Sequence, residues 1–123
     1  MDFKGLGRHL IVEVFGVNPK LLDDEEKLKE ILIQSALEAG GKICGVLFHK
    51  FEPQGVTGLV LIAESHISIH TWPEHGYAAM DIFTCGSNVN PWKAFHYSVQ
   101  ELKPRNVNVV EVKRGLITCE QQT

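Results

Sequence analysis

Residues 57–63 form a nearly continuous apolar run in the middle of the chain. Its length suits a β-strand and falls far short of a membrane span. A strand that is apolar on both faces is typical of the interior of a sheet. This run therefore predicts a central strand, and the flanking segments must supply the rest of the sheet.

Strand-like runs lie on both sides of this central run. Residues 42–51 alternate in part, residues 67–72 alternate Ile, Ser, Ile and His, and residues 77–84 form another strand. Residues 8–15, which are apolar and β-branched, predict the first strand. Residues 107–112 predict the last one.

Two segments have the three- and four-residue spacing of amphipathic helices. The first ends near Ala39, ahead of two glycines, and its buried face consists of Leu28, Ile31, Leu32, Ser35, Ala36 and Ala39. The second begins with Asn90 as N-cap and Pro91 at the first helical position, and its buried stripe consists of Trp92, Phe95, Val99 and Leu102. The order β-α-β-β-β-α-β predicts an α/β fold, a two-layer sandwich with two helices on one face of a largely antiparallel sheet. Residues 1–123 are expected to form a single domain.

Charge, hydropathy and cysteine content limit the kinds of partner and the cellular location that the sequence predicts. The net charge is −3 and no basic block occurs, so nucleic acid is not expected as a partner. No run approaches a membrane span, and residues 1–5 lack the apolar run of a signal peptide. Three scattered cysteines without a secretory signal indicate free thiols in the cytoplasm. A chain this short also makes a homo-oligomer plausible.

Reactive side chains are concentrated between residues 49 and 85. A metal site is one interpretation, but His66 and His70 on a strand would lie ~13 Å apart, so no metal is expected. A hydrolase is the second, although the Gly-x-Ser-x-Gly elbow is missing. The third is a cleavage of the backbone centred on Ser65.

The motifs in this region resemble a known family, the prokaryotic-type S-adenosylmethionine decarboxylases, which depend on a pyruvoyl group. The strongest matches are residues 64–74 (ESHISIHTWPE) and 81–86 (DIFTCG). Weaker matches are residues 5–10 (GLGRHL), 48–51 (FHKF), 55–58 (GVTG) and 90–95 (NPWKAF). The resemblance covers most of the chain, and its ordered motifs are specific to the superfamily.

The resemblance implies that the chain is a proenzyme that makes its own cofactor. Cleavage between Glu64 and Ser65 would give a β chain, residues 1–64, and an α chain, residues 65–123, with the pyruvoyl group derived from Ser65. His70 matches the family's processing base and Cys85 its proton donor. The activity implied is decarboxylation of S-adenosylmethionine to the aminopropyl donor for spermidine synthesis.

Substrate binding and assembly also follow from the resemblance. Phe51 and Trp72 match aromatic residues that hold adenine, and Glu74 matches the acidic residue that binds the ribose hydroxyls. Family members are homodimers with active sites at the subunit interface. Thr57 stands where the family often has a serine associated with processing, which bears on the processing rate.

Other interpretations stay open at this point. Taken singly, Ser65, His70 and Cys85 each have an ordinary structural explanation, as a turn serine, a strand histidine and a buried thiol. A pyruvoyl-dependent arginine decarboxylase on the same scaffold is the nearest alternative. A second is a non-catalytic member that is never cleaved and serves as a binding or regulatory subunit.

Overall fold

Six strands and their helices form two layers in the computed structural model, which describes residues 3–63 and 65–118. The apolar run that predicted a central strand forms β3 (Val56–Ile62), flanked by a strand on each side. The elements follow one another as β1 (Phe3–Phe15), α1 (Pro19–Leu22), α2 (Glu25–Glu38), β2 (Ile43–Lys50), β3, β4 (Ser65–Trp72), η1 (Pro73–His75), β5 (Tyr77–Cys85), α3 (Pro91–Leu102) and β6 (Asn106–Thr118).

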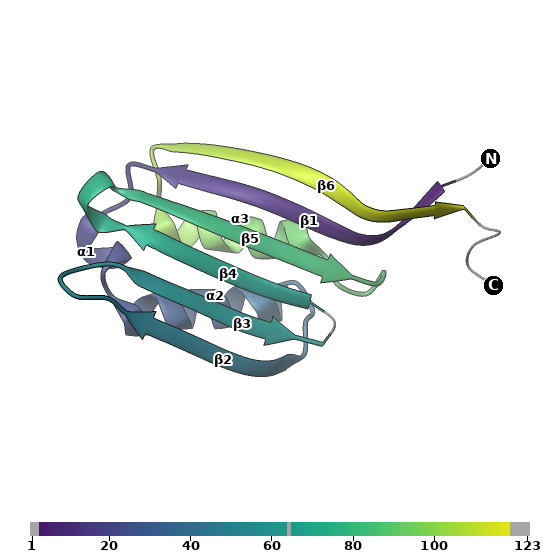
Figure 1. Cartoon of the computed structure of the whole chain (residues 1–123), viewed down its shortest axis with the longest axis horizontal. Helices are drawn as coiled ribbons and strands as arrows, with labels where there is room; N and C mark the ends of the chain where they lie inside the picture. The colour runs from purple at the N-terminus through teal and green to yellow at the C-terminus, as the bar shows by residue number, and fades with distance from the viewer. Residues whose placement is uncertain (1–2, 64, 119–123) are drawn as a thin grey trace.

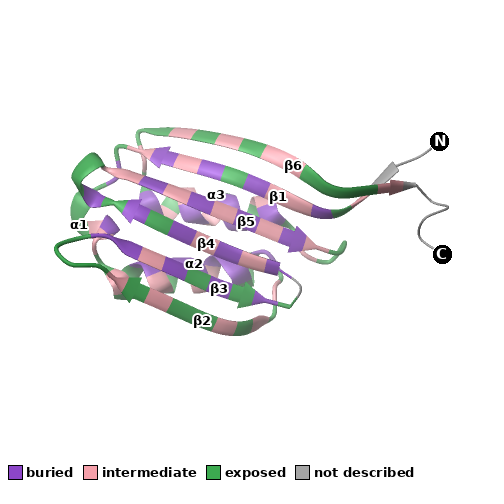
Figure 2. Ribbon diagram, viewed as in Figure 1, coloured by how far each residue is buried: buried purple, intermediate pink, exposed green. Residues whose placement is uncertain are grey.

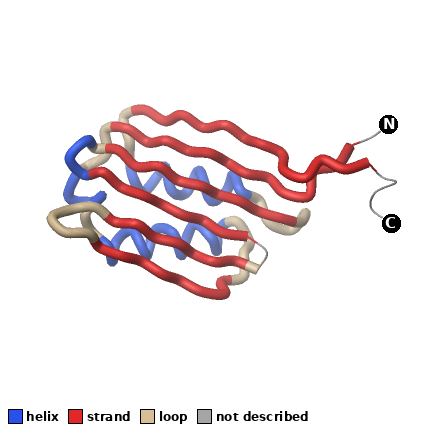
Figure 3. Tube along the Cα trace, in the orientation of Figure 1, coloured by secondary structure: helices blue, strands red, loops and turns tan. Residues whose placement is uncertain are grey.

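The sheet order is β2-β3-β4-β5-β1-β6, and every neighbouring pair is antiparallel. Both long helices, α2 and α3, lie behind this sheet in the view of Figures 1 and 3. The predicted α/β sandwich is therefore confirmed. All six predicted strand runs are present; the order written from the sequence left out one of the four that separate the two long helices, β2 to β5. The short helix α1 was not predicted.

The helix ends follow the capping chemistry in the sequence. Asn90 accepts a hydrogen bond from the Trp92 N–H at 3.0 Å, as predicted for the N-cap of α3. Asp24 caps α2 in the same way, accepting from the Lys27 N–H at 3.1 Å. Gly40 follows α2 with a φ of +86°, a conformation that glycine adopts without strain.

The two faces of the sheet differ in their surroundings. Along β4, alternate side chains from Ser65 to Thr71 are buried against the helices, and Figure 2 shows this banding across the sheet. The helices contribute Leu28, Ile31 and Leu32 to the shared core. The opposite surface, here called the open face, carries exposed apolar side chains on every strand except β5, among them Ile11, Leu47, Leu59, Leu61, Trp72 and Val110. Within the described residues, no helix covers that face (Figure 1).

A search of the described residues for a helix long and apolar enough to cross a membrane finds none.

Candidate active site

Ser65 opens β4 with its side chain on the helix-covered face, and only 4% of the residue is exposed. Its Oγ accepts a hydrogen bond from the backbone N–H of Cys85 at 3.1 Å. Two of the residues predicted to act in the chemistry are therefore neighbours across β4 and β5. Glu64, the predicted upstream side of the cleavage site, lies outside the described residues.

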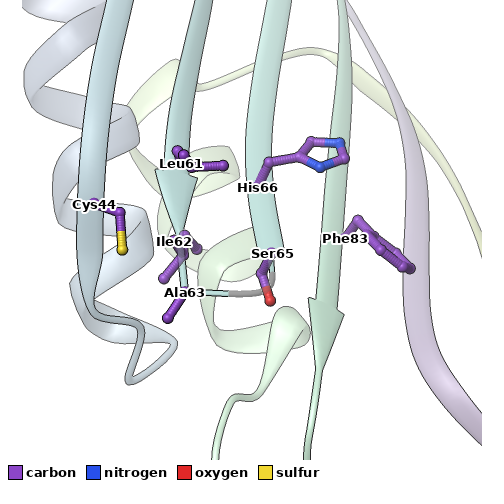
Figure 4. Close-up of a pocket in the computed structure, with 7 residues that line it drawn as sticks. All are labelled: Cys44, Leu61, Ile62, Ala63, Ser65, His66 and Phe83. Carbon is purple, nitrogen blue, oxygen red and sulfur yellow. The ribbon is translucent and has the colours of Figure 1, made fainter.

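A shallow pocket of about 380 Å³ lies beside Ser65. Figure 4 shows its lining, which is Cys44, Leu61, Ile62, Ala63, Ser65, His66 and Phe83. Its surface is almost wholly apolar apart from Ser65 and His66. The His66 ring lies 5.7 Å from the Phe83 ring, centroid to centroid. Small molecules can therefore approach the start of β4 from the open face.

Cys85 ends β5 and borders a second, larger cavity of about 800 Å³. The first strand and the β5–α3 loop line this cavity through Gly5, Leu6, Gly7, Arg8, Thr84, Cys85, Gly86, Ser87 and Val89. Cys85 is partly exposed and forms no disulfide. Its thiol is thus accessible at the end of β5, and the backbone of the same residue holds the Ser65 side chain.

His70 lies near the other end of β4, on the open face. Its Nδ1 is 3.0 Å from the Oγ1 of Thr57, which is opposite it on β3. This contact orients the imidazole and leaves Nε2 directed elsewhere. Thr57 therefore supplies a hydroxyl next to His70 at the position where the family often has a serine.

The residues predicted to bind substrate lie at the same end of the sheet as His70. Phe51 is 45% exposed and Trp72 is 42% exposed, so both present aromatic surface to solvent. Phe51 contacts the His49 ring, with centroids 4.5 Å apart. Trp72 ends β4, and Glu74 follows it in η1 with an exposed side chain.

Distance divides these residues into two groups within one chain. Ser65 and Trp72 are the first and last residues of β4, a separation of ~23 Å along an extended strand. Ser65 and His70 are five positions apart, an odd number, so their side chains point to opposite faces. One protomer therefore carries the predicted site residues in two groups, or candidate half-sites: Ser65 with Cys85 at one end, and Thr57, His70, Phe51, Trp72 and Glu74 at the other.

A charged cluster on the open face was not found from the sequence. The Nε2 of His9 is 2.8 Å from Asp81 Oδ1, and Arg114 Nη1 is 3.2 Å from His9 Nδ1. The guanidinium of Arg114 also lies over the Phe83 ring, 5.8 Å from its centroid. Arg114 is more than 100 positions from His9 in sequence, so only the pairing of β1 with both β5 and β6 reveals this cluster.

A second ion pair supports the end of the sheet near Ser65. Arg8 donates two hydrogen bonds to Glu111, at 3.2 and 3.0 Å, and the Trp92 indole N–H donates a third at 2.6 Å. The hydrogen bonds from Arg8 and then Trp92 hold the pKa of the Glu111 carboxyl below its ordinary value. This network fixes α3 against β1 and β6, beside the cavity that Cys85 borders.

Comparison with known proteins identifies one family. The family model described as S-adenosylmethionine decarboxylase matches residues 8–115, most of the chain. The chain belongs to this family. Among curated relatives, the S-adenosylmethionine decarboxylase proenzyme of Moorella thermoacetica is 53% identical over 118 residues, covering 96% of this chain and 94% of its own. That of Caldanaerobacter subterraneus subsp. tengcongensis is 52% identical over 111 residues, covering 90% of each chain.

Solved structures agree with the fold. The crystal structure of the adenosylmethionine decarboxylase from Aquifex aeolicus has a TM-score of 0.89 at 35% identity, covering 94% of this chain and 96% of that one. The Trypanosoma brucei AdoMetDC-delta26 monomer, at 17% identity and a TM-score of 0.62, shares the fold and covers 85% of this chain and 45% of its own. None of these relatives is described as an arginine decarboxylase, so that alternative has no support.

Proposed function

We propose that this chain is a proenzyme that cleaves itself between Glu64 and Ser65 and then decarboxylates S-adenosylmethionine to the aminopropyl donor for spermidine synthesis. The observation that carries the proposal is the contact between the Cys85 N–H and Ser65 Oγ at 3.1 Å. It joins the residue expected to be converted with the residue expected to donate the proton, at the start of a buried strand. Both belong to the motifs on which the resemblance to the family rests.

Ser65 fits the origin of a pyruvoyl group. Its Oγ is held by a backbone N–H, its side chain is buried, and a pocket opens beside it. Such a group supplies a carbonyl that reacts with the substrate amine and accepts the electron pair released when CO₂ leaves. In the chain itself, the Ser65 Oγ attacks the preceding carbonyl, and the Cys85 thiol returns a proton to the product carbon.

The separation of the half-sites points to a homodimer. His70 cannot reach the Ser65 of its own chain, because the two lie on opposite faces of β4 and ~16 Å apart along it. A second copy stacked on the open face, with its strands running the opposite way, would bring its own His70 and Thr57 to the start of β4, where the shallow pocket beside Ser65 opens. The exposed apolar side chains of that face, such as Leu59 at 37% and Val110 at 59%, suit burial between two sheets.

The same arrangement would complete the substrate site from two chains. Phe51 and Trp72 offer aromatic faces, on which a sulfonium cation gains about 0.5–2 kcal/mol. Glu74 offers a carboxylate to the ribose hydroxyls. In a dimer these groups come from the subunit opposite the one that supplies Ser65 and Cys85.

Mass spectrometry of the purified protein tests the first half of the proposal. We expect two chains with a junction at 64/65 and a carbonyl-capped α chain, whereas Ser65→Ala should remain a single chain. Release of CO₂ from S-adenosylmethionine and from arginine then tests the second half. An intact chain after long incubation would favour a non-catalytic member, and preference for arginine would overturn the substrate.

A further inference from the structure

One buried hydroxyl near Ser65 has no hydrogen-bond partner. Thr84 Oγ1 is the sole buried side-chain nitrogen or oxygen in this state among residues 5–63 and 65–117, and Thr84 is only 1% exposed. Burial of a polar group without a partner costs folding free energy, and valine would fill the same space without that cost. An unpaired hydroxyl at such a position suggests that it forms its hydrogen bond only during the reaction.

The strand register places this hydroxyl beside Ser65. His66 on β4 is opposite Phe83 on β5, so Ser65 is opposite Thr84 one step further along the same antiparallel pair. Both side chains point to the helix-covered face, and directly opposed residues have Cβ atoms about 4.5–5.5 Å apart. Thr84 and Ser65 are therefore cross-strand neighbours in a buried environment.

The hydrogen bonds of Ser65 are half complete. Its Oγ accepts from the Cys85 N–H, but its own O–H has no acceptor within the part of the chain that the structure describes. Thr84 Oγ1 offers two free lone pairs one residue away from that N–H. At the Cβ spacing of a cross-strand pair, a change of χ1 rotamer at either residue can bring the two hydroxyls within hydrogen-bond distance.

We propose that Thr84 is a positioning residue for self-cleavage, whose Oγ1 accepts the hydrogen bond of the Ser65 hydroxyl as this attacks the preceding carbonyl. The inference rests on the proposed function. In the step, the bond from Ser65 Oγ to the carbonyl carbon of residue 64 forms and the peptide C–N bond breaks. The hydroxyl proton ends on the nitrogen of residue 65, so atoms and charge balance. Thr84 directs the O–H and with it the attacking lone pair; a neutral threonine hydroxyl is far too weak a base to keep the proton.

In this assignment, Thr84 acts only in self-cleavage and not in the decarboxylation that follows. After cleavage, the former side-chain oxygen of Ser65 leaves as part of the new carboxylate of the upstream chain. The group that Thr84 orients then no longer exists. Loss of its hydroxyl should slow cleavage and leave the turnover of each cleaved chain unchanged.

The test compares Thr84→Val with Thr84→Ser in a pulse of cell-free translation, following cleavage of the full chain by gel and mass spectrometry. We expect cleavage of Thr84→Val to slow on the order of tenfold, the loss of about one hydrogen bond in the attacking geometry, while Thr84→Ser cleaves like wild type. Thermal unfolding of Thr84→Val should occur at or above the wild-type temperature. CO₂ release, normalised to the amount of α chain, should match wild type.

Thr71→Val is the matched control. Thr71 is also buried on β4, but its hydroxyl donates to Leu22 O at 2.7 Å and accepts from the Val56 N–H at 2.9 Å. It lies six residues from Ser65, or ~20 Å along the strand. Thr71→Val should unfold at lower temperature yet cleave at the wild-type rate below that temperature.

Several results would overturn the inference. These are wild-type cleavage in Thr84→Val, equal slowing in Thr84→Ser, equal slowing in Thr71→Val, or a turnover loss per cleaved chain in Thr84→Val. Failure of the wild-type chain to cleave at all is a different result, which refutes the proposed function itself.

Discussion

Complementation between two inactive variants tests whether His70 acts on the partner subunit. Ser65 and His70 point to opposite faces of β4, so one chain cannot bring them together. Ser65→Ala lacks the hydroxyl that attacks the preceding carbonyl, and His70→Ala lacks the base. Each variant alone should stay uncleaved, because every dimer it forms lacks the same component at both sites.

A mixture of the two variants should recover part of the cleavage. When equal amounts are co-expressed with distinguishable tags, random pairing makes about half of all dimers mixed. Each mixed dimer has one site that combines the Ser65 of the His70→Ala chain with the His70 of the Ser65→Ala chain. About half of the His70→Ala chains should therefore be cut, and none of the Ser65→Ala chains. His70 is exposed and contacts Thr57 on the surface of the sheet, so its replacement should leave the fold intact.

The assay is mass spectrometry of the tagged chains after co-expression. Absence of cleavage in the mixture would refute the assignment of His70 to the partner, provided that size measurement shows mixed dimers. Cleavage of His70→Ala expressed alone would refute its assignment as the base.

Two further predictions concern assembly and acid stability. Leu59→Glu on the open face should yield monomers that fold but do not cleave. The control variant Leu37→Glu, at an exposed position of α2, should stay dimeric and cleave. Size-exclusion chromatography with light scattering distinguishes monomers from dimers, and a Leu59→Glu protein that is dimeric and cleaves would contradict the interface. Glu111 has a lowered pKa in the folded state, so its contribution to stability is complete above the ordinary value of 4.5 and is lost as pH falls through the lower folded value. Melting curves should therefore show an advantage of wild type over Glu111→Gln near neutral pH that shrinks as pH falls below 4.5; a pH-independent difference would contradict this role.

The interior of the fold was predictable because its elements follow local rules. The apolar run of β3 and the N-cap Asn90 were both predicted, because each acts within a few positions. The ends of β1 and β6 were missed, since both strands extend past the predicted residues 8–15 and 107–112. Those ends contain glycines and charged residues of low strand propensity, and they are strands because they pair with each other.

The candidate site was predictable as a set of residues but not as an arrangement. The motifs identified Ser65 and Cys85, yet only the β4–β5 register shows that the backbone of one holds the side chain of the other. The division into two half-sites also needed the sheet, because it depends on which face each residue occupies. The unpaired hydroxyl of Thr84 has no sequence signal, since burial and lack of a partner are properties of the folded chain.

The sheet order has a consequence for how the molecule could be made. A cut at 64/65 would leave β1, β2 and β3 on one fragment and β4, β5 and β6 on the other, yet β1 lies between β5 and β6. The fragments would also share the α2–α3 contact, where the Ser35 and Ser98 hydroxyls meet at 2.7 Å. The two fragments could not separate without breaking three strand pairs: β3 with β4, β5 with β1, and β1 with β6. Folding before the cut is a first-order process of one chain, whereas refolding after it would require two chains to meet and would depend on concentration. The chain would therefore have to fold before it is cut. A cleaved molecule, once unfolded, would not refold by the single-chain process through which it first folded.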